Sequence, residues 1–210
     1  MQEIINRAKE LLADGTVVRV LGWRIGDLPY NPEPSYFETA EDLEANFVYN
    51  GFCGANLSKY MIEGSKLEGK TLVFLKPCDT YSFNQLIKEN RVDREKAYII
   101  GVGCKGKLDV EKIKAQGVKG ILSIQGAEIE GDADVLTVET LYGEKTVPYK
   151  DAMLERCHVC KGKEHMIFDE EIGESADTKD ADRFHEVEKI EAMEPEEKFA
   201  YFQKELSKCI

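Results

Sequence analysis

Six cysteines are the residues of this 210-residue chain whose type and spacing could do chemistry. Cys157 and Cys160 form a C-x-x-C pair, a spacing that lets two thiolates hold one metal centre. Cys78 and Cys104 each follow an apolar run that predicts a strand. The carboxyl ends of parallel strands lie along one edge of an α/β sheet, where ligands bind. Four thiolates gathered there would match the ligands of a [4Fe–4S] cluster or of a structural zinc ion.

Each cysteine also has an ordinary interpretation. A single cysteine at a strand end usually serves packing, and a lone C-x-x-C pair in a cytosolic protein can be a zinc half-site or a redox dithiol. Thioredoxin chemistry is disfavoured because the pair does not open a helix after a core strand. Structural zinc sites usually combine two C-x-x-C knuckles, whereas Cys78 and Cys104 stand alone, which favours iron–sulfur. His158 and His165 flank the pair, and we expect them to be solvated loop residues rather than ligands.

Composition and charge narrow the function classes. The formal net charge is −12, which argues against a nucleic-acid partner and against an anionic membrane surface. No apolar run reaches the roughly 20 residues that a membrane-spanning helix needs, and the N-terminus lacks a signal peptide's apolar stretch. The sequence therefore predicts a cytoplasmic protein without membrane insertion. Cysteines in that reducing compartment serve as ligands, redox groups or buried side chains rather than as a disulfide framework.

The elements that must position the cysteines alternate between strand and helix. Strands are predicted within 16–24, 71–79, 96–106 and 119–124, and helices over 2–13, 55–62, 80–90 and 110–118. This order predicts an α/β fold with a mainly parallel open sheet and flanking helices. Residues 26–46, with three prolines, are predicted to form a loop with a short acidic helix, and residues 134–149 a small β-hairpin insertion.

The predicted domain organisation has two parts. Residues 1–173 form the α/β domain that carries the iron–sulfur and flavin candidates, and residues 174–210 an acidic linker and a C-terminal helical tail. The tail helix is predicted over 195–208, where Phe199, Phe202 and Leu206 recur at helical spacing. No glycine-rich dinucleotide loop or P-loop occurs.

Two stretches resemble a known family: LKPCDTYSFNQLIKENRVDREKAYIIGVGCKG and ERCHVCKGKEHMIFDEEIGE. They are similar to the beta-subunit family of coenzyme F420 hydrogenases and dehydrogenases. The branch closest in pattern is often labelled formate dehydrogenase beta subunit or ferredoxin-like protein. The resemblance spans roughly residues 45–175. It implies that Cys78, Cys104, Cys157 and Cys160 bind a [4Fe–4S] cluster beside a flavin site, with FAD as the flavin.

The flavin neighbourhood that the resemblance implies lies around two segments. Its candidate residues are Cys53, Gly54, Asn56, Lys76 and Asp79. Flavin-binding members carry a Ser-Gly-Gly turn, where this chain has Asn-Gly-Phe-Cys-Gly at 50–54. Cys53 has packing as its alternative role, and Asp79 has helix capping. Lys76 and Lys105 are candidates for offsetting the charge of the thiolates.

The resemblance implies an electron-transfer subunit. Its partner would be an oxidoreductase of the formate dehydrogenase, hydrogenase or heterodisulfide-reductase type. The alternative is a zinc-stapled interaction module without redox activity, and a weaker third possibility is a flavin enzyme with incidental cysteines. Longer members continue into a ferredoxin-like domain with two further clusters. The ending SKCI resembles its start, with Cys209 as a first ligand or, alternatively, as a frayed terminal thiol.

Overall fold

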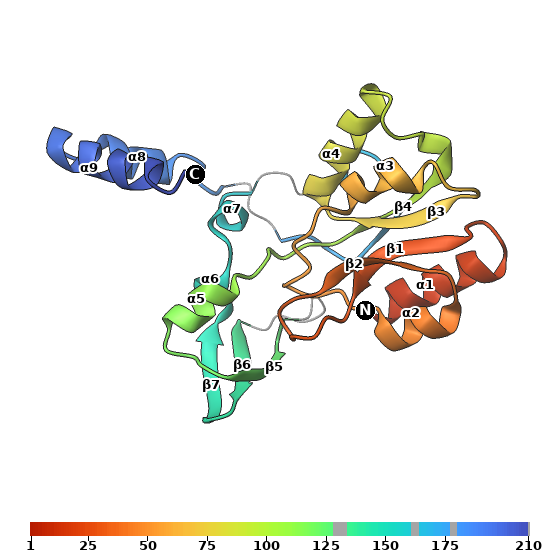
Figure 1. The fold of residues 1–210 in the computed structure, drawn as a ribbon, viewed down its shortest axis with the longest axis horizontal. Helices are drawn as coiled ribbons and strands as arrows, with labels where there is room; N and C mark the ends of the chain where they lie inside the picture. The colour runs from red at the N-terminus through yellow and green to blue at the C-terminus, as the bar shows by residue number, and fades with distance from the viewer. Residues whose placement is uncertain (128–133, 161–163, 177–179, 210) are drawn as a thin grey trace. The chain divides into compact units, whose positions relative to one another are not determined.

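The structure is a computed structural model that describes residues 1–127, 134–160, 164–176 and 180–209 (Figure 1). The chain divides into two compact units, Met1–Thr178 and Lys179–Ile210. Residues 177–179 of the predicted linker lie outside the described residues. None of the helices in the described ranges has both the length and the hydrophobicity that crossing a membrane requires.

The first unit contains most of the secondary structure. Its strands are β1 Arg19–Arg24, β2 Glu33–Phe37, β3 Thr71–Leu75, β4 Ala97–Val102, β5 Ile121–Gln125, β6 Val135–Thr140, β7 Gly143–Pro148 and β8 Glu170–Ile172. Its α-helices are α1 Gln2–Ala13, α2 Ala40–Asn46, α3 Met61–Gly64, α4 Pro77–Lys88, α5 Val110–Ala115, α6 Tyr149–Ala152 and α7 Glu155–His158. Two short 3-10 helices are η1 Leu57–Tyr60 and η2 Arg94–Lys96.

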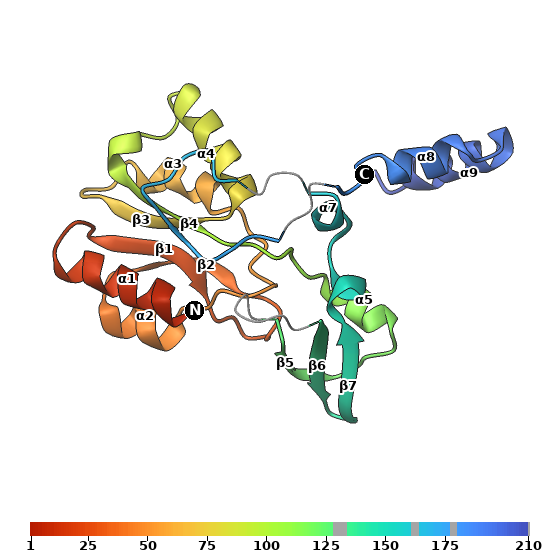
Figure 2. The ribbon, with the colours of Figure 1, turned by 180° about the vertical axis from the view of Figure 1, so that it is seen from behind.

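The main sheet has the strand order β2-β1-β3-β4-β8. Strands β1, β3, β4 and β8 run parallel, and β2 is antiparallel at one edge. Helices α1 and α2 cover one face, while α3 and α4 cover the other (Figures 1 and 2). The predicted α/β fold with a mainly parallel sheet and flanking helices is confirmed.

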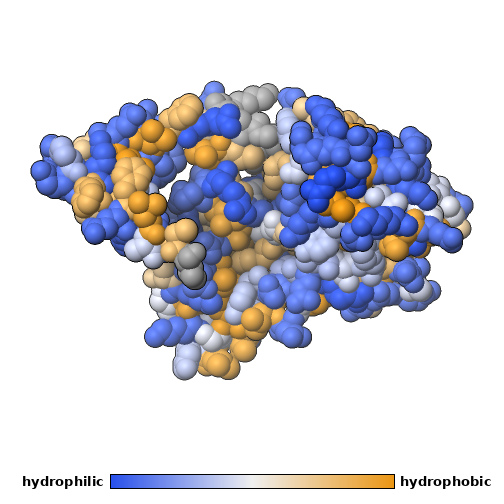
Figure 3. All heavy atoms as spheres, turned by 45° about the horizontal axis from the view of Figure 1, so that its top comes forward, coloured by the Kyte–Doolittle hydropathy of each residue, from blue (hydrophilic) through white to orange (hydrophobic). Residues whose placement is uncertain are grey.

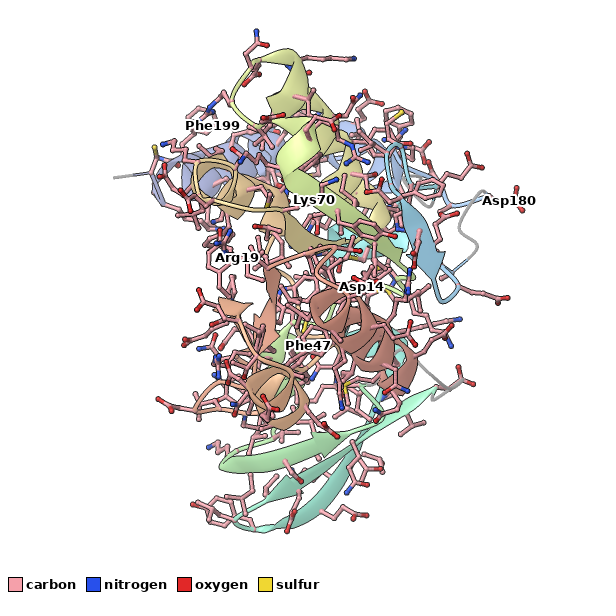
Figure 4. All side chains as sticks on the ribbon, turned by 90° about the vertical axis from the view of Figure 1, so that its right-hand side faces the viewer. Asp14, Arg19, Phe47, Lys70, Asp180 and Phe199 are labelled. Atoms are coloured by element: carbon pink, nitrogen blue, oxygen red, sulfur yellow. The ribbon has the colours of Figure 1, made fainter. Side chains whose placement is uncertain are left out.

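The core explains why these segments fold as they do. All five residues of β3 are buried, as expected for a central parallel strand covered on both faces. Helix α1 presents a buried apolar stripe to the sheet, as its spacing predicted. Phe47, labelled in Figure 4, packs against Phe37 and Phe74 with ring centroids 6.0 and 5.2 Å apart. A second stacked pair, Trp23 and Tyr49, lies 5.1 Å apart.

A second, antiparallel sheet has the order β5-β6-β7. Strands β6 and β7 are the predicted hairpin. The strand predicted over 119–124 was expected beside the parallel strands, but β5 pairs with β6 instead. Its side chains are at most half-buried, unlike the continuous buried run of β3, so it suits a small sheet with one open face.

Two strands of the main sheet were missed by the sequence analysis. Strand β2 lies in the predicted loop 26–46 and contains Pro34, which an edge strand tolerates because one side of it needs no ladder bonds. Strand β8 has only three residues, two of them glutamates, at the opposite edge. Neither has the apolar pattern that identifies a central strand.

The second unit contains α8 His185–Glu191 and α9 Pro195–Leu206. Helix α9 confirms the predicted C-terminal helix, and a capping box between Glu194 and Glu197 fixes its start. Phe199, also labelled in Figure 4, remains exposed. Hydrophilic residues dominate the face drawn in Figure 3, in keeping with the strong net charge.

The first prediction concerns the close approach of the backbone segments that follow β4 and β8. Gly103 donates to the carbonyl of Ile172 at 2.9 Å, and a Cβ at Gly103 would lie 2.4 Å from the backbone oxygen of Glu174. Gly103→Ala must therefore push the two segments apart, and we expect it to lower the free energy of unfolding by about 1–3 kcal/mol. Urea denaturation measures this change.

The matched control is Gly54→Ala, whose added Cβ would meet only the Phe52 oxygen at 3.8 Å. Because that position has room, its unfolding free energy should change by less than about 1 kcal/mol. Equal stabilities of the two variants would contradict the close approach at Gly103.

Candidate metal centre

Cys78 lies in the first turn of α4, immediately after β3. Lys76 is the N-cap residue and Pro77 the first helical residue, whose fixed φ suits a helix start. The predicted helix began at residue 80, so the structure moves Cys78 from a strand end into the helix itself. Cys78 is exposed and stands at the positive end of the helix dipole.

Cys104 lies two residues beyond the end of β4. Strands β3 and β4 are adjacent and parallel, with Leu75 opposite Gly101, so Cys78 and Cys104 follow neighbouring strands at the same sheet edge. Cys104 is buried, and the segment after β8 holds its backbone. The Cys104 amide donates to Ser175 Oγ at 3.1 Å, and its carbonyl accepts from the Ala176 amide at 3.0 Å.

The C-x-x-C pair is brought to this edge by a backbone tether. Leu154 donates to the carbonyl of Lys107 at 2.8 Å, and Asp109 donates to the carbonyl of Ala152 at 2.8 Å. An isolated bridge joins Leu108 and Met153 between these bonds. The residues just before α7 are thus paired with those just after Cys104. Helix α7 carries Cys157, and Cys160 follows it, so both thiols come within a few residues of this tethered segment.

The protonation of Cys78 and of Tyr149 depends on neighbouring thiols. Desolvation by the surrounding protein raises the pKa of Cys78 to about 12, with further contributions from Asp79, Cys104 and Cys160. Burial also raises the pKa of Tyr149, and Cys104 and Cys157 add to this shift. At neutral pH the Cys78 thiol therefore keeps its proton, which a bound metal would displace. Cys104 thus acts electrostatically on both Cys78 and Tyr149, while Cys160 acts on Cys78 and Cys157 acts on Tyr149.

The spacing of the thiols limits which metal centre fits. Among the described residues, no three cysteine sulfurs lie within 4.8 Å of one another. A tetrahedral zinc ion with Zn–S bonds of about 2.3 Å would hold its thiolate sulfurs only about 3.8 Å apart. The described thiols are therefore not gathered into the tight tetrahedron of a zinc site.

Behind Cys78 lies a buried ion pair. Lys76 and Asp79 are 2% and 3% exposed, and Lys76 Nζ lies 2.5 Å from Asp79 Oδ2. The same ammonium donates to the carbonyl of Ala55 at 2.8 Å and stands 4.8 Å from the centroid of the Trp23 ring. Two residues predicted for the flavin neighbourhood are therefore occupied with each other and with the segment that contains the rest.

The remaining flavin candidates lie in that segment, residues 53–56. Cys53 is fully buried, its sulfur accepts from the Asn50 amide at 3.4 Å, and burial raises its pKa. Asn56 caps η1 by accepting from the Ser58 amide at 3.0 Å. Gly54 has open space beside its Cα. The contacts of Cys53 and Asn56 are those of structural residues.

Two residues that the sequence analysis missed lie against Cys104. The Tyr49 hydroxyl donates to the carbonyl of Gly103 at 2.8 Å. Lys107, only 3% exposed, donates from Nζ to the carbonyl of Asn50 at 2.9 Å and stands 4.4 Å from the centroid of the Tyr49 ring. Burial lowers the pKa of Lys107, while Cys104 and Cys53 act in the opposite direction. A lysine in a sequence usually indicates a residue on the protein surface. Only the position of Lys107, three residues after Cys104, could have marked it as a candidate for the site.

The expectation of solvated histidines is wrong for His165. Its side chain is 4% exposed, and its Nδ1 lies 2.6 Å from Glu171 Oε1. A Cβ at Gly101 would meet the His165 ring at 2.8 Å, and one at Gly106 would meet Met153 Sδ at 2.7 Å. The small residues around the cysteines therefore admit other parts of the protein.

Comparison with known proteins shows which family the cysteine-containing region resembles. Residues 68–167 match a family described as the C-terminal part of the beta subunit of coenzyme F420 hydrogenase/dehydrogenase. This segment is similar to that family, and the match covers just under half of the chain. The match includes Cys78, Cys104, Cys157 and Cys160, so all four candidate ligands lie within the family region. The resemblance inferred from the sequence is confirmed. No curated protein matches the chain.

The fold of the chain is similar to that of one chain in a solved complex. One chain of the F420-reducing [NiFe] hydrogenase complex from Methanosarcina barkeri, in a xenon-derivatised structure, aligns with a TM-score of 0.55. The two chains are 18% identical, and the alignment covers 75% of this chain and 58% of that one. At this identity the likeness shows a shared fold, and the alignment spans just over half the length of the relative.

The buried ion pair generates the second prediction. Asp79→Asn keeps the side-chain shape but leaves the Lys76 ammonium buried without a counter-charge. We expect it to lower the unfolding free energy of the metal-free protein by about 3–5 kcal/mol, measured by urea denaturation. The control is Glu63→Gln, because the pair between Glu63 and Lys66 is exposed and should contribute less than about 1 kcal/mol.

A double variant that removes both charges also tests whether Lys76 and Asp79 form a buried ion pair. In Lys76→Met with Asp79→Leu, no charge remains to be desolvated, so the double variant should be more stable than Asp79→Asn. If Asp79→Asn were as harmless as Glu63→Gln, the pair would not be buried as described.

Proposed function

We propose that this chain is a cytoplasmic electron-transfer subunit in which Cys78, Cys104, Cys157 and Cys160 hold one [4Fe–4S] cluster. The subunit relays single electrons to or from a partner oxidoreductase. The observation that carries the proposal is the tether between residues 152–154 and 107–109. It delivers the C-x-x-C pair to the edge where the other two cysteines follow adjacent parallel strands.

The donor set supports iron–sulfur over zinc. Four thiolates are the usual ligands of a [4Fe–4S] cluster, and soft sulfur ligands also suit zinc. The ligand arrangement supports the cluster, because Cys78 in the first turn of α4 and Cys104 after β4 do not form a second C-x-x-C knuckle.

The chain's own groups would set the properties of such a centre. The cluster supplies a carrier for one electron at a time. The N-terminal end of α4 places its positive dipole at Cys78, and the bond from the Cys104 amide to Ser175 Oγ fixes the direction of that backbone. Burial of Cys104 lowers the dielectric on one side, while exposure of Cys78 leaves the other side open to a partner. Proton loss from the thiols accompanies loading.

The partner is proposed from the family. A beta subunit of a hydrogenase or dehydrogenase works beside other subunits, and the solved relative is itself a chain of a hydrogenase complex. We therefore propose a partner of the hydrogenase, formate dehydrogenase or heterodisulfide-reductase type. The net charge of −12 favours a basic docking surface on that partner.

Metal and flavin analysis on one anaerobic preparation tests the proposal. We expect about four irons and four sulfides per chain, as the composition of the cluster requires, and a visible absorption that dithionite bleaches. One zinc ion without iron, after attempted cluster reconstitution, would overturn the proposal in favour of a structural staple. FAD released from the same sample would add a flavin to the electron path, and its absence would leave the cluster as the carrier.

Serine substitutions test the ligands one by one. Cys78→Ser, Cys104→Ser, Cys157→Ser and Cys160→Ser should each lose most of the iron and sulfide, because an alkoxide is a poor substitute for a thiolate. Cys209→Ser is the matched control, since its exposed thiol lies in the second unit and should leave the metal content unchanged. Full iron in any of the first four variants would remove that residue from the ligand set.

A further inference from the structure

Lys107 is the one feature near the cysteines whose position the electron-transfer role has not yet used. Leu108 donates to the carbonyl of Gly51 at 2.8 Å, so the backbone after Cys104 is paired with the segment that follows Tyr49. That pairing turns the Lys107 side chain inward, where its ammonium reaches the Asn50 carbonyl. The lysine is thus held by backbone geometry rather than by an acidic partner.

The two buried lysines of this region differ in whether a carboxylate neutralises the charge of the ammonium. Lys76 has Asp79 as its counter-ion at 2.5 Å. Lys107 has the Asn50 carbonyl and the face of the Tyr49 ring, and within the described part of the chain no carboxylate pairs with it. The carbonyl of Asn50 accepts a hydrogen bond but carries no full negative charge, so Lys107 keeps a surplus of positive charge in a water-excluded place.

Besides desolvation, the groups that act electrostatically on Lys107 are Cys104, Cys53 and Asp79, which favour the charged ammonium, and Lys76, which opposes it. The Tyr49 hydroxyl donates to the carbonyl of Gly103, the residue before Cys104, and the Lys107 ammonium lies over the Tyr49 ring. The electric field of a buried ammonium passes through protein rather than through water. Its effect on neighbouring groups is therefore weakly screened.

We propose that Lys107 is a buried positioning residue whose charge raises the reduction potential of the cluster held through Cys104. The inference rests on the proposed function, because it requires the cluster. Reduction adds one negative charge to a centre that is already anionic, and a nearby positive charge stabilises the reduced form more than the oxidised form. Lys76 contributes less, since Asp79 cancels its charge.

A redox titration of the loaded protein, followed by electron paramagnetic resonance, measures the effect. Lys107→Met keeps the apolar stem and removes the charge. We expect the equilibrium between reduced and oxidised cluster to shift about tenfold or more toward the oxidised form. For a one-electron couple, a tenfold shift lowers the midpoint potential by about 59 mV. The shift should persist at high salt, because the charge is buried.

Three further variants separate charge from structure. Lys107→Arg keeps the charge and should restore most of the parent potential. Lys107→Gln keeps a donor for the Asn50 carbonyl and tests charge removal if the methionine variant fails to hold the cluster. Lys105→Met removes a lysine that is next to Cys104 in sequence but not buried, and it should shift the equilibrium less.

The outcomes distinguish this inference from the proposed function. A parent protein that binds no iron and sulfide would overturn the electron-transfer proposal itself. A loaded Lys107→Met or Lys107→Gln protein with the parent potential would overturn only the role of Lys107. Equal shifts in Lys107→Met and Lys107→Arg would do the same, because they would show that packing and not charge is responsible.

Discussion

The parallel pairing of β3 with β4 is the constraint on which the rest of the site depends. Because these strands are neighbours in register, whatever follows each of them is placed at one sheet edge. Helix α4 starts within two residues of β3, so Cys78 cannot move away from that edge. The extension of β8 then pairs with the extension of β4 and fixes the backbone of Cys104. The sheet therefore positions two of the four candidate ligands without any contribution from the C-x-x-C segment.

The second pair of ligands depends on a different kind of restraint. Cys157 and Cys160 lie beyond the small antiparallel sheet, far from Cys104 in sequence. The chain returns to the strand edge only because residues 152–154 pair with 107–109. The strands of this insertion contribute to a buried cluster that also includes Phe52, Leu108 and Ile113, so the insertion packs against the segment that follows Cys104. The chain leaves the sheet edge after residue 109, passes through the β-rich insertion, and comes back to the same segment at residues 152–154.

Sequence patterns predicted the parts of this architecture that carry strong local signals. The apolar runs of β3 and β4 and the periodicity of α1 identified the core, and the cysteines after the strands identified the edge. Strand β8 could not be found, because three residues with two glutamates have no pattern of their own and form a strand only by pairing with β4. Lys107 and His165 were missed or misplaced for a related reason. Their burial depends on segments distant in sequence, which charge and polarity alone would place in water.

The charges around the cysteines connect the stability of the fold with occupancy of the candidate metal site. Burying an ammonium without a counter-ion costs several kcal/mol, and Lys107 has no carboxylate partner among the described residues. That cost falls when thiolates and an anionic centre stand opposite the ammonium. The same anionic centre would be costly beside Asp79, but Lys76 already cancels that carboxylate. One lysine therefore removes a repulsion and the other supplies an attraction. Loading of the metal centre should accordingly stabilise the fold that creates it.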